Sequence, residues 1–110
     1  MKIYHIVPKS NWSSKNKEYR GDTLDTQGFI HCSTKDQVVE VADYLFKGRT
    51  DLLLLVIDED KIKSPIKYED AGNGKLYPHI YGPLNADAVL ATLEFKPKDD
   101  GSFALPTSLR

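Results

Sequence analysis

Leu52-Leu53-Leu54-Leu55-Val56-Ile57 is the stretch that decides the fold, because every residue in it is apolar. A strand that is apolar at both of its alternating faces is typical of the interior of a sheet that is covered on both sides. Asp51 precedes this stretch and the acidic turn Asp58-Glu59-Asp60 follows it. The sequence therefore predicts a buried strand over 52–57 at the centre of a β-sheet.

Other short segments have the composition of strands on either side of this centre. Residues 2–7 combine β-branched and aromatic side chains and end at Pro8, and Gly28 introduces a second such segment. Pro78 lies inside a third, and because proline cannot donate to a ladder it favours an edge strand or a bulge there. The predicted strands cover residues 2–7, 28–33, 66–69, 76–81 and 88–95, with a loop over 18–26 and a turn over 70–74.

One helix has a clear start signal. Thr34 and Gln37 have the spacing of a capping box, in which the hydroxyl accepts from the N3 amide and the glutamine side chain reaches back to the cap amide. Apolar side chains then follow at helical spacing, and Gly48 ends the pattern. These apolar residues are Val38, Val41, Ala42 and Leu45. Short helical turns are expected at 9–16 and 85–87, so the sequence predicts an α/β-type fold with one main helix.

Length and composition predict a single domain over residues 1–110, with a polar tail from about residue 97. The net charge is -1, which excludes an overall basic field for nonspecific nucleic-acid binding. Cys32 is the only cysteine, so no internal disulfide is possible, as expected of a reducing compartment. The segment 1–9 lacks the apolar run of a signal peptide, and 52–57 is too short to cross a bilayer. We therefore expect a cytoplasmic protein without membrane contact.

The three histidines are the most informative chemical groups. His5, His31 and His79 each lie inside an apolar strand-like segment. Taken singly, each could be a hydrogen-bonded histidine of the core or the sheet. Taken together, three strand histidines must each satisfy or expose two ring nitrogens, and a shared polar cleft does this more easily than three separate burials. This favours a common site.

Several neighbours could complete that site. In an extended strand Ser33 lies on the same face as His31, although it could merely end the strand before the helix. Cys32 then points away from His31, which disfavours a nucleophilic Cys-His pair. Glu69 lies at the end of a strand beside a glycine turn and could reach a cleft, or it could be a surface charge.

Aromatic side chains offer a second set of candidates. Tyr77 and Tyr81 share a strand face with His79, where they could sandwich a flat ring or serve as ordinary packing. The standard motifs for dinucleotides, phosphate loops and metalloproteases are absent. A three-histidine zinc site is possible in principle, because catalytic zinc needs three protein ligands. No metal is expected, since no supporting pattern is present.

Four segments carry a family resemblance: 3–6 with Trp12, 28–33 with Gln37, 54–58 and 77–84. They resemble a family of small bacterial proteins catalogued as a domain of unknown function (number 952). The resemblance runs from Met1 to about Phe103 and is specific around His31 and His79. Remote similarity groups that family with ADP-ribosyltransferases and RNA 2'-phosphotransferases. Its other label, glutathione S-transferase-like, does not fit, because 110 residues leave no room for a thioredoxin-like and a helical domain.

The resemblance implies an α+β fold with a small split mixed β-sheet and a cleft for a nicotinamide dinucleotide. It implies that His5 holds the ribose next to nicotinamide and that Ser33 braces the same region. It also implies a glutamate that stabilises the cationic sugar, a role for which Glu69 or His79 is available. A carboxylate suits that role because cleavage of a glycosidic bond develops oxocarbenium character.

Three hypotheses follow. The first is an ADP-ribosyltransferase-like enzyme acting on NAD as a substrate, or on a nucleotide or RNA 2'-phosphate. The second is a binding module for a nucleotide-like or small anionic ligand without turnover, and the third is a metal-dependent hydrolase. The candidate catalytic residues are His5, His31, His79 and Glu69, and the candidate ligand-binding residues are Ser33, Tyr77, Tyr81 and Trp12.

Overall fold

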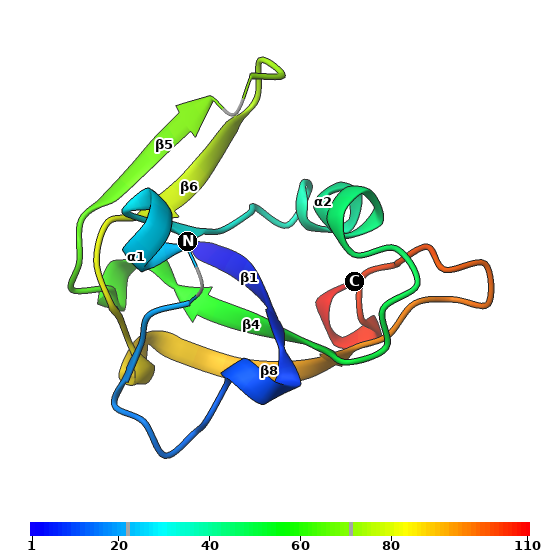
Figure 1. Cartoon of the computed structure of the whole chain (residues 1–110), viewed down its shortest axis with the longest axis horizontal. Helices are drawn as coiled ribbons and strands as arrows, with labels where there is room; N and C mark the ends of the chain where they lie inside the picture. Colours follow the sequence, from blue (N-terminus) through cyan, green and yellow to red (C-terminus); the bar gives the residue numbers. More distant parts are fainter. Residues whose placement is uncertain (22, 71) are drawn as a thin grey trace.

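The computed structural model describes residues 1–21, 23–70 and 72–110. Its central element is β4 (Leu52–Asp58), which lies between β1 (Lys2–Pro8) and β8 (Val89–Phe95) in a three-stranded antiparallel sheet (Figure 1). Leu52, Leu54, Leu55 and Ile57 have no exposed surface. The prediction that this stretch is the buried centre of a sheet is confirmed.

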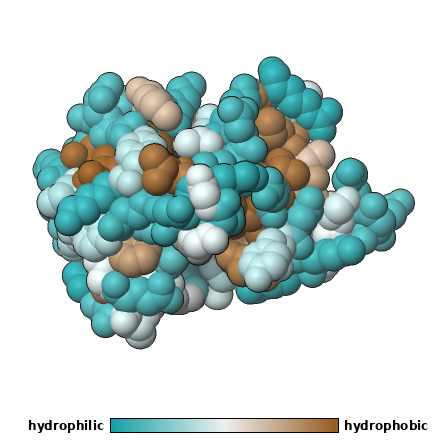
Figure 2. Space-filling model, turned by 90° about the horizontal axis from the view of Figure 1, so that it is seen from above, coloured by the Kyte–Doolittle hydropathy of each residue, from teal (hydrophilic) through white to brown (hydrophobic). Residues whose placement is uncertain are grey.

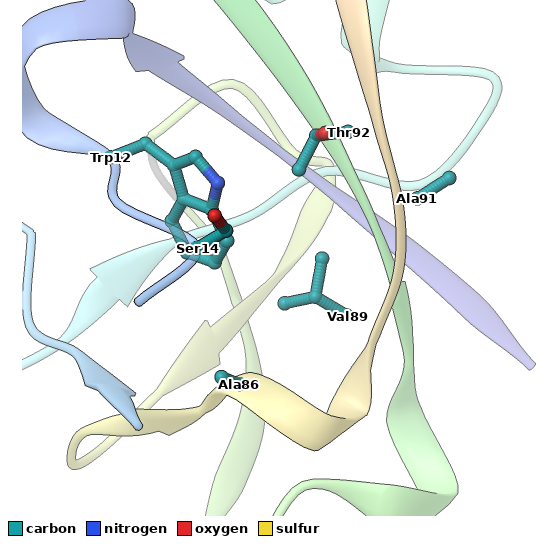
Figure 3. Close-up of a pocket in the computed structure, with 6 residues that line it drawn as sticks. All are labelled: Trp12, Ser14, Ala86, Val89, Ala91 and Thr92. Atoms are coloured by element: carbon teal, nitrogen blue, oxygen red, sulfur yellow. The ribbon is translucent and has the colours of Figure 1, made fainter. Parts of the chain in front are cut away.

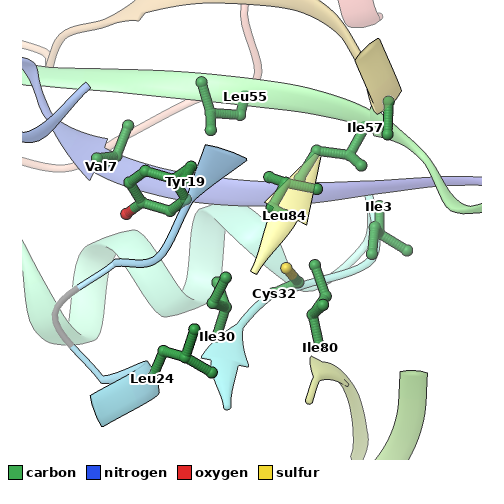
Figure 4. Close-up of a cluster of buried hydrophobic side chains, with 11 residues drawn as sticks. Ile3, Val7, Tyr19, Leu24, Ile30, Cys32, Leu55, Ile57, Ile80 and Leu84 are labelled. Atoms are coloured by element: carbon green, nitrogen blue, oxygen red, sulfur yellow. The ribbon is translucent and has the colours of Figure 1, made fainter. Parts of the chain in front are cut away.

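Strand β4 builds a core on each face because its side chains alternate. Leu54 and Val56 pack with Phe95 and with α2 (Val38–Leu45) on one face. Leu55 and Ile57 point to the opposite face, where a second cluster joins the central sheet to two smaller sheets (Figure 4). The central sheet is therefore covered on both sides.

Two smaller sheets cover the second face. Strand β2 (Glu18–Tyr19) pairs with β7 (Leu84–Asn85), and β6 (Leu76–Ile80) lies between β3 (Ile30–His31) and β5 (Ile66–Asp70). The expected α+β class and the split of the sheet are confirmed.

The expectation of a mixed sheet is wrong for the described residues. All the strand pairs found among them are antiparallel. A parallel pair needs a long crossover, and the crossover through α2 joins β3 to β4, which lie in different sheets. That connection therefore creates no parallel ladder.

Pro78 corrects another expectation, because β6 is the central strand of its sheet and not an edge. The carbonyl of Pro78 accepts from the Cys32 amide at 3.0 Å, so the proline nitrogen also faces β3. Just after Cys32 the chain leaves β3 and runs beside β1, where Ser33 and Tyr4 exchange backbone hydrogen bonds of 2.7 and 2.8 Å. The missing donor of Pro78 therefore lies where the β3–β6 ladder ends.

The main helix was predicted correctly, but its start differs. It begins at Val38, and Gln37 Oε1 accepts from the Thr34 amide at 3.0 Å, which is one half of the capping box. A helix that the sequence did not predict, α1 (Leu24–Gln27), overlaps the end of the expected loop over 18–26 and ends at Gly28 with φ 89°. None of the helices among the described residues is long and apolar enough to cross a membrane.

Single turns of 3-10 helix complete the described structure. Two of them fall at 9–16 and 85–87, where helical turns were expected. The loop over 18–26 and the turn over 70–74 include positions 22 and 71, which lie outside the described residues. The 3-10 turns are η1 (Lys9–Asn11), η2 (Glu59–Lys61), η3 (Ala86–Ala88) and η4 (Thr107–Leu109).

Candidate functional site

The outer face of the β3–β6–β5 sheet gathers most of the candidate residues. The register places His31 opposite His79 and His79 opposite Lys67, so nitrogen-bearing side chains from all three strands form one row. The neighbouring row, Ile30, Ile80 and Ile66, points the other way into the core. We call this outer surface the histidine face. Its residues are Phe29, His31, Lys67, Glu69, His79 and Tyr81.

A carboxylate and an imidazole form the chemical centre of the histidine face. His79 Nδ1 lies 2.9 Å from Glu69 Oε1, which also accepts from the Tyr81 hydroxyl. These bonds, first from Tyr81 and then from His79, lower the pKa of Glu69, and the Glu69 bond raises the pKa of Tyr81. Glu69 is therefore held as an anion at neutral pH, with Oε1 occupied.

His79 is buried, but one of its nitrogens reaches solvent. Its Nδ1 donates to Glu69, so in the neutral ring the lone pair is on Nε2. Nε2 has no hydrogen-bond partner among the described residues. Because every fully buried side-chain nitrogen or oxygen of those residues has a partner, Nε2 is not fully buried and contacts water. Phe29 stacks on the ring with centroids 4.1 Å apart. His79 is thus a buried, oriented base with one nitrogen in contact with water.

His31 lies beside His79, with ring centroids 5.3 Å apart in an edge arrangement. Its Nε2 lies 2.9 Å from Gln27 Oε1, an acceptor, so Nε2 carries the proton and Nδ1 carries the lone pair. Partial burial against the neighbouring rings lowers the pKa of His31, and His79 lowers it further. The site thus offers two imidazole lone pairs side by side.

His31 is expected to titrate below the ordinary histidine value of 6.5. Since folding favours the neutral ring, its contribution to stability is complete above 6.5 and is lost as the pH falls through the lowered folded pKa. An NMR titration of the ring protons measures the midpoint. His79→Gln should raise that midpoint, because the neighbouring imidazole of His79 is the second cause of the lowered pKa of His31. A His31 midpoint at or above 6.5 in the unmodified chain would contradict this description.

His5 lies behind the histidine face. Its Nδ1 lies 2.6 Å from the His31 carbonyl oxygen and therefore donates, and its Nε2 lies 2.8 Å from the Tyr19 hydroxyl. The structure thus brings His31 and His79 into ring contact, whereas His5 reaches His31 through the main chain. This arrangement suits His5 to positioning the β3 segment.

The aromatic contacts continue from His5 to Trp12. The ring of Tyr19 lies 5.3 Å from that of His5 and 5.6 Å from that of Trp12. Trp12 borders a shallow hollow beside β8, shown in Figure 3, together with Ser14, Val89 and other residues. Neither this hollow nor a second one bordered by Tyr19 is lined by His31, His79 or Glu69. The expected ligand-binding Trp12 thus lies apart from the histidine face.

The remaining candidates fall in different places. Ser33 is buried and its backbone pairs with Tyr4, so it has left the strand that carries His31. Tyr77 is opposite Glu69 across β6 and β5, so it shares the histidine face with His79 as predicted, and its hydroxyl accepts from Asn73 at 2.9 Å. Cys32 points into the core, as predicted, and burial raises the pKa of its thiol.

Sequence reasoning did not select Phe29, Gln27 or Lys67. The signal for Phe29 and Lys67 was strand alternation, since residues 29 and 31 share a face, as do 67 and 69. Gln27 gave no such signal, because it reaches His31 from the four-residue helix α1. Within residues 1–21, 23–70 and 72–110, no three His, Cys, Asp or Glu side chains are grouped to hold a metal ion.

Comparison with known proteins places the chain in a family. A family model described as protein of unknown function (DUF952) matches residues 6–92. The chain belongs to this family. A search of curated proteins gave no match.

Solved structures similar to this chain include those of protein CC0527 from Caulobacter crescentus. Its X-ray structure is 27% identical, covers 96% of this chain and 95% of that chain, and has a TM-score of 0.86. The solution NMR structure of CC0527 gives 30% identity over 94% and 92% of the two chains, with a TM-score of 0.81. The described fold is therefore similar to one determined by experiment.

Proposed function

We propose that this DUF952 protein is an enzyme of the ADP-ribosyltransferase type that acts on the ribosyl group of NAD or a related nucleotide. The observation that carries the proposal is the Glu69–His79 pair, in which His79 Nδ1 lies 2.9 Å from Glu69 Oε1. Because a carboxylate oxygen accepts, Nδ1 donates, and in the neutral ring Nε2 carries the lone pair. A carboxylate that orients an imidazole is the arrangement that makes a histidine an effective general base. The remote grouping of the family supplies the reaction type.

The chemistry is assigned to named atoms. The bond between the ribosyl C1' and the nicotinamide nitrogen breaks, and the electron pair leaves with nicotinamide. Glu69 Oε2 has no hydrogen-bond partner among the described residues, so the carboxylate can face the cationic sugar. A hydroxyl oxygen of the acceptor, or of water, bonds to C1', and its proton passes to His79 Nε2. The imidazolium that forms is stabilised by Glu69.

The aromatic side chains give the face a binding role. Phe29 contacts His79, His31 and Tyr81, with ring centroids 4.1, 4.6 and 5.2 Å apart. Stacked and tilted rings of this kind favour contact with a flat heterocycle. The expectation that Tyr81 helps to bind a flat ring thus becomes part of the proposal, together with Phe29.

A second candidate is a nucleotide-binding module without turnover. It is favoured by the openness of the histidine face, because His31 is exposed and the Glu69 side chain keeps 39% of its surface. Water therefore reaches the histidine face. Electrostatic catalysis is stronger where water is excluded, so this exposure favours binding without turnover. In Figure 2 the hydrophobic residues of the upper side form separate areas between hydrophilic ones, so no broad apolar surface dominates that view.

Nicotinamide release distinguishes the two candidates. The protein is incubated with NAD, nicotinamide is quantified by chromatography, and thermal shifts are recorded with NAD and ADP-ribose. The enzyme proposal predicts release above the uncatalysed rate and a higher melting temperature with both ligands. A thermal shift without release would leave the binding module, and no response in either assay would contradict both.

A further inference from the structure

We infer that Lys67 forms a phosphate subsite on the histidine face, so that the preferred ligand is a ribosyl group bearing a phosphate. This inference rests on the proposed function, because it concerns the ligand of the same face. It begins from the row His31, His79 and Lys67, which the strand register fixes on adjacent strands. A basic side chain is thereby placed next to the oriented imidazole.

Lys67 lies near Glu69, where its charge helps to lower the pKa of that carboxyl, but it forms no ion pair with it. Its Nζ lies 5.0 Å from the centroid of the Tyr81 ring, and no hydrogen bond or ion pair joins it to a described residue. The ion-paired cations are Lys9 with Glu94, Arg20 with Asp25, Arg49 with Asp51 and Lys75 with Glu40. Lys67 thus has a charge available for an anion.

Lys67 and Glu69, both on β5, place charges of opposite sign near His79 on the histidine face. Glu69 bonds to His79, and its anionic form suits a sugar that becomes positive. Lys67 is exposed, lies opposite His79 on β5 and contacts the Tyr81 ring, and an ammonium there suits a phosphate oxygen. A ribosyl phosphate matches both charges, whereas an uncharged riboside uses only one of them.

The phosphate subsite is tested with two ligands that differ by one group. Nicotinamide riboside and nicotinamide mononucleotide share the base and the ribose, and only the second carries a phosphate. We expect the unmodified chain to bind the mononucleotide about tenfold more tightly, the effect of one charge-assisted contact at an exposed site. Calorimetry measures both dissociation constants, and inorganic phosphate should weaken only the mononucleotide.

Lys67→Met removes the charge and keeps the apolar stem over Tyr81, so the affinity ratio should fall to about one. Lys35→Met, at an exposed position before α2, is the matched control and should leave the ratio near ten. Equal affinities in the unmodified chain, or a ratio that survives Lys67→Met, would overturn the phosphate subsite. Nicotinamide release from NAD would still support the proposed function in that case. Failure of both ligands to bind would also overturn the phosphate subsite, whereas the proposed function is tested separately by nicotinamide release from NAD.

Discussion

Replacing Leu55 with alanine is expected to lower the free energy of unfolding by about 3 kcal/mol, because truncating a buried leucine loses transfer energy and leaves a cavity. Leu55 has no exposed surface and lies at the middle of β4, opposite His5 on β1 and Thr92 on β8. Its side chain belongs to the core that joins the central sheet to the smaller sheets (Figure 4). Urea denaturation followed by circular dichroism measures the change.

Leu90→Ala is the matched control for this substitution. Leu90 also lies in the central sheet, but the register between β4 and β8 shifts there and leaves it 46% exposed. Its truncation should cost well under about 1 kcal/mol, as for most surface changes. Equal losses for the two variants would show that Leu55 does not lie at the centre of the core.

The second large effect is expected at Glu69. Glu69→Gln keeps an oxygen that can accept from His79 and Tyr81, but it removes the negative charge that the sugar requires. If the protein releases nicotinamide as proposed, we expect the rate to fall by roughly 100-fold, the size typical of losing one charge at a reacting centre. Chromatographic assay of nicotinamide at saturating NAD measures the effect.

Glu94→Gln is the control, because it neutralises a carboxylate that pairs with Lys9 on the central sheet. This variant should retain full turnover. An active enzyme in which Glu69→Gln also retained full turnover would remove the carboxylate from the mechanism. A loss shared by both variants would point to a general effect of charge and would equally count against the assigned role.

The centre of the fold could be predicted from the sequence because 52–57 is apolar at both alternating faces, which only a doubly covered strand can bury. Pro78 could not be interpreted in the same way. A residue without an N–H cannot lie inside a continuous ladder of hydrogen bonds, but it is tolerated where the ladder ends. The β3–β6 ladder ends here because the chain leaves β3 and Ser33 pairs with Tyr4 of β1. Long-range pairing of this kind leaves no local signal.

The candidate site was predictable in part for the same reason. Strand alternation indicated that His79 and Tyr81 share a face, and both bind Glu69. The ring contact of His31 with His79 depends on the pairing of strands far apart in sequence. His5 was grouped with them, although a carbonyl and a hydroxyl bind its nitrogens, because the register of distant strands cannot be derived from residue types.

We propose the histidine face as the surface where this protein receives its nucleotide-like ligand. Titrating isotope-labelled protein with ADP-ribose, and following the backbone and imidazole NMR signals, tests it most directly. The largest shifts should occur at Phe29, His31, Lys67 and His79, with little change at Trp12 and Val89 beside the separate hollow. Saturable shifts confined to Trp12 and Val89, or no shifts at millimolar ADP-ribose, would contradict the account.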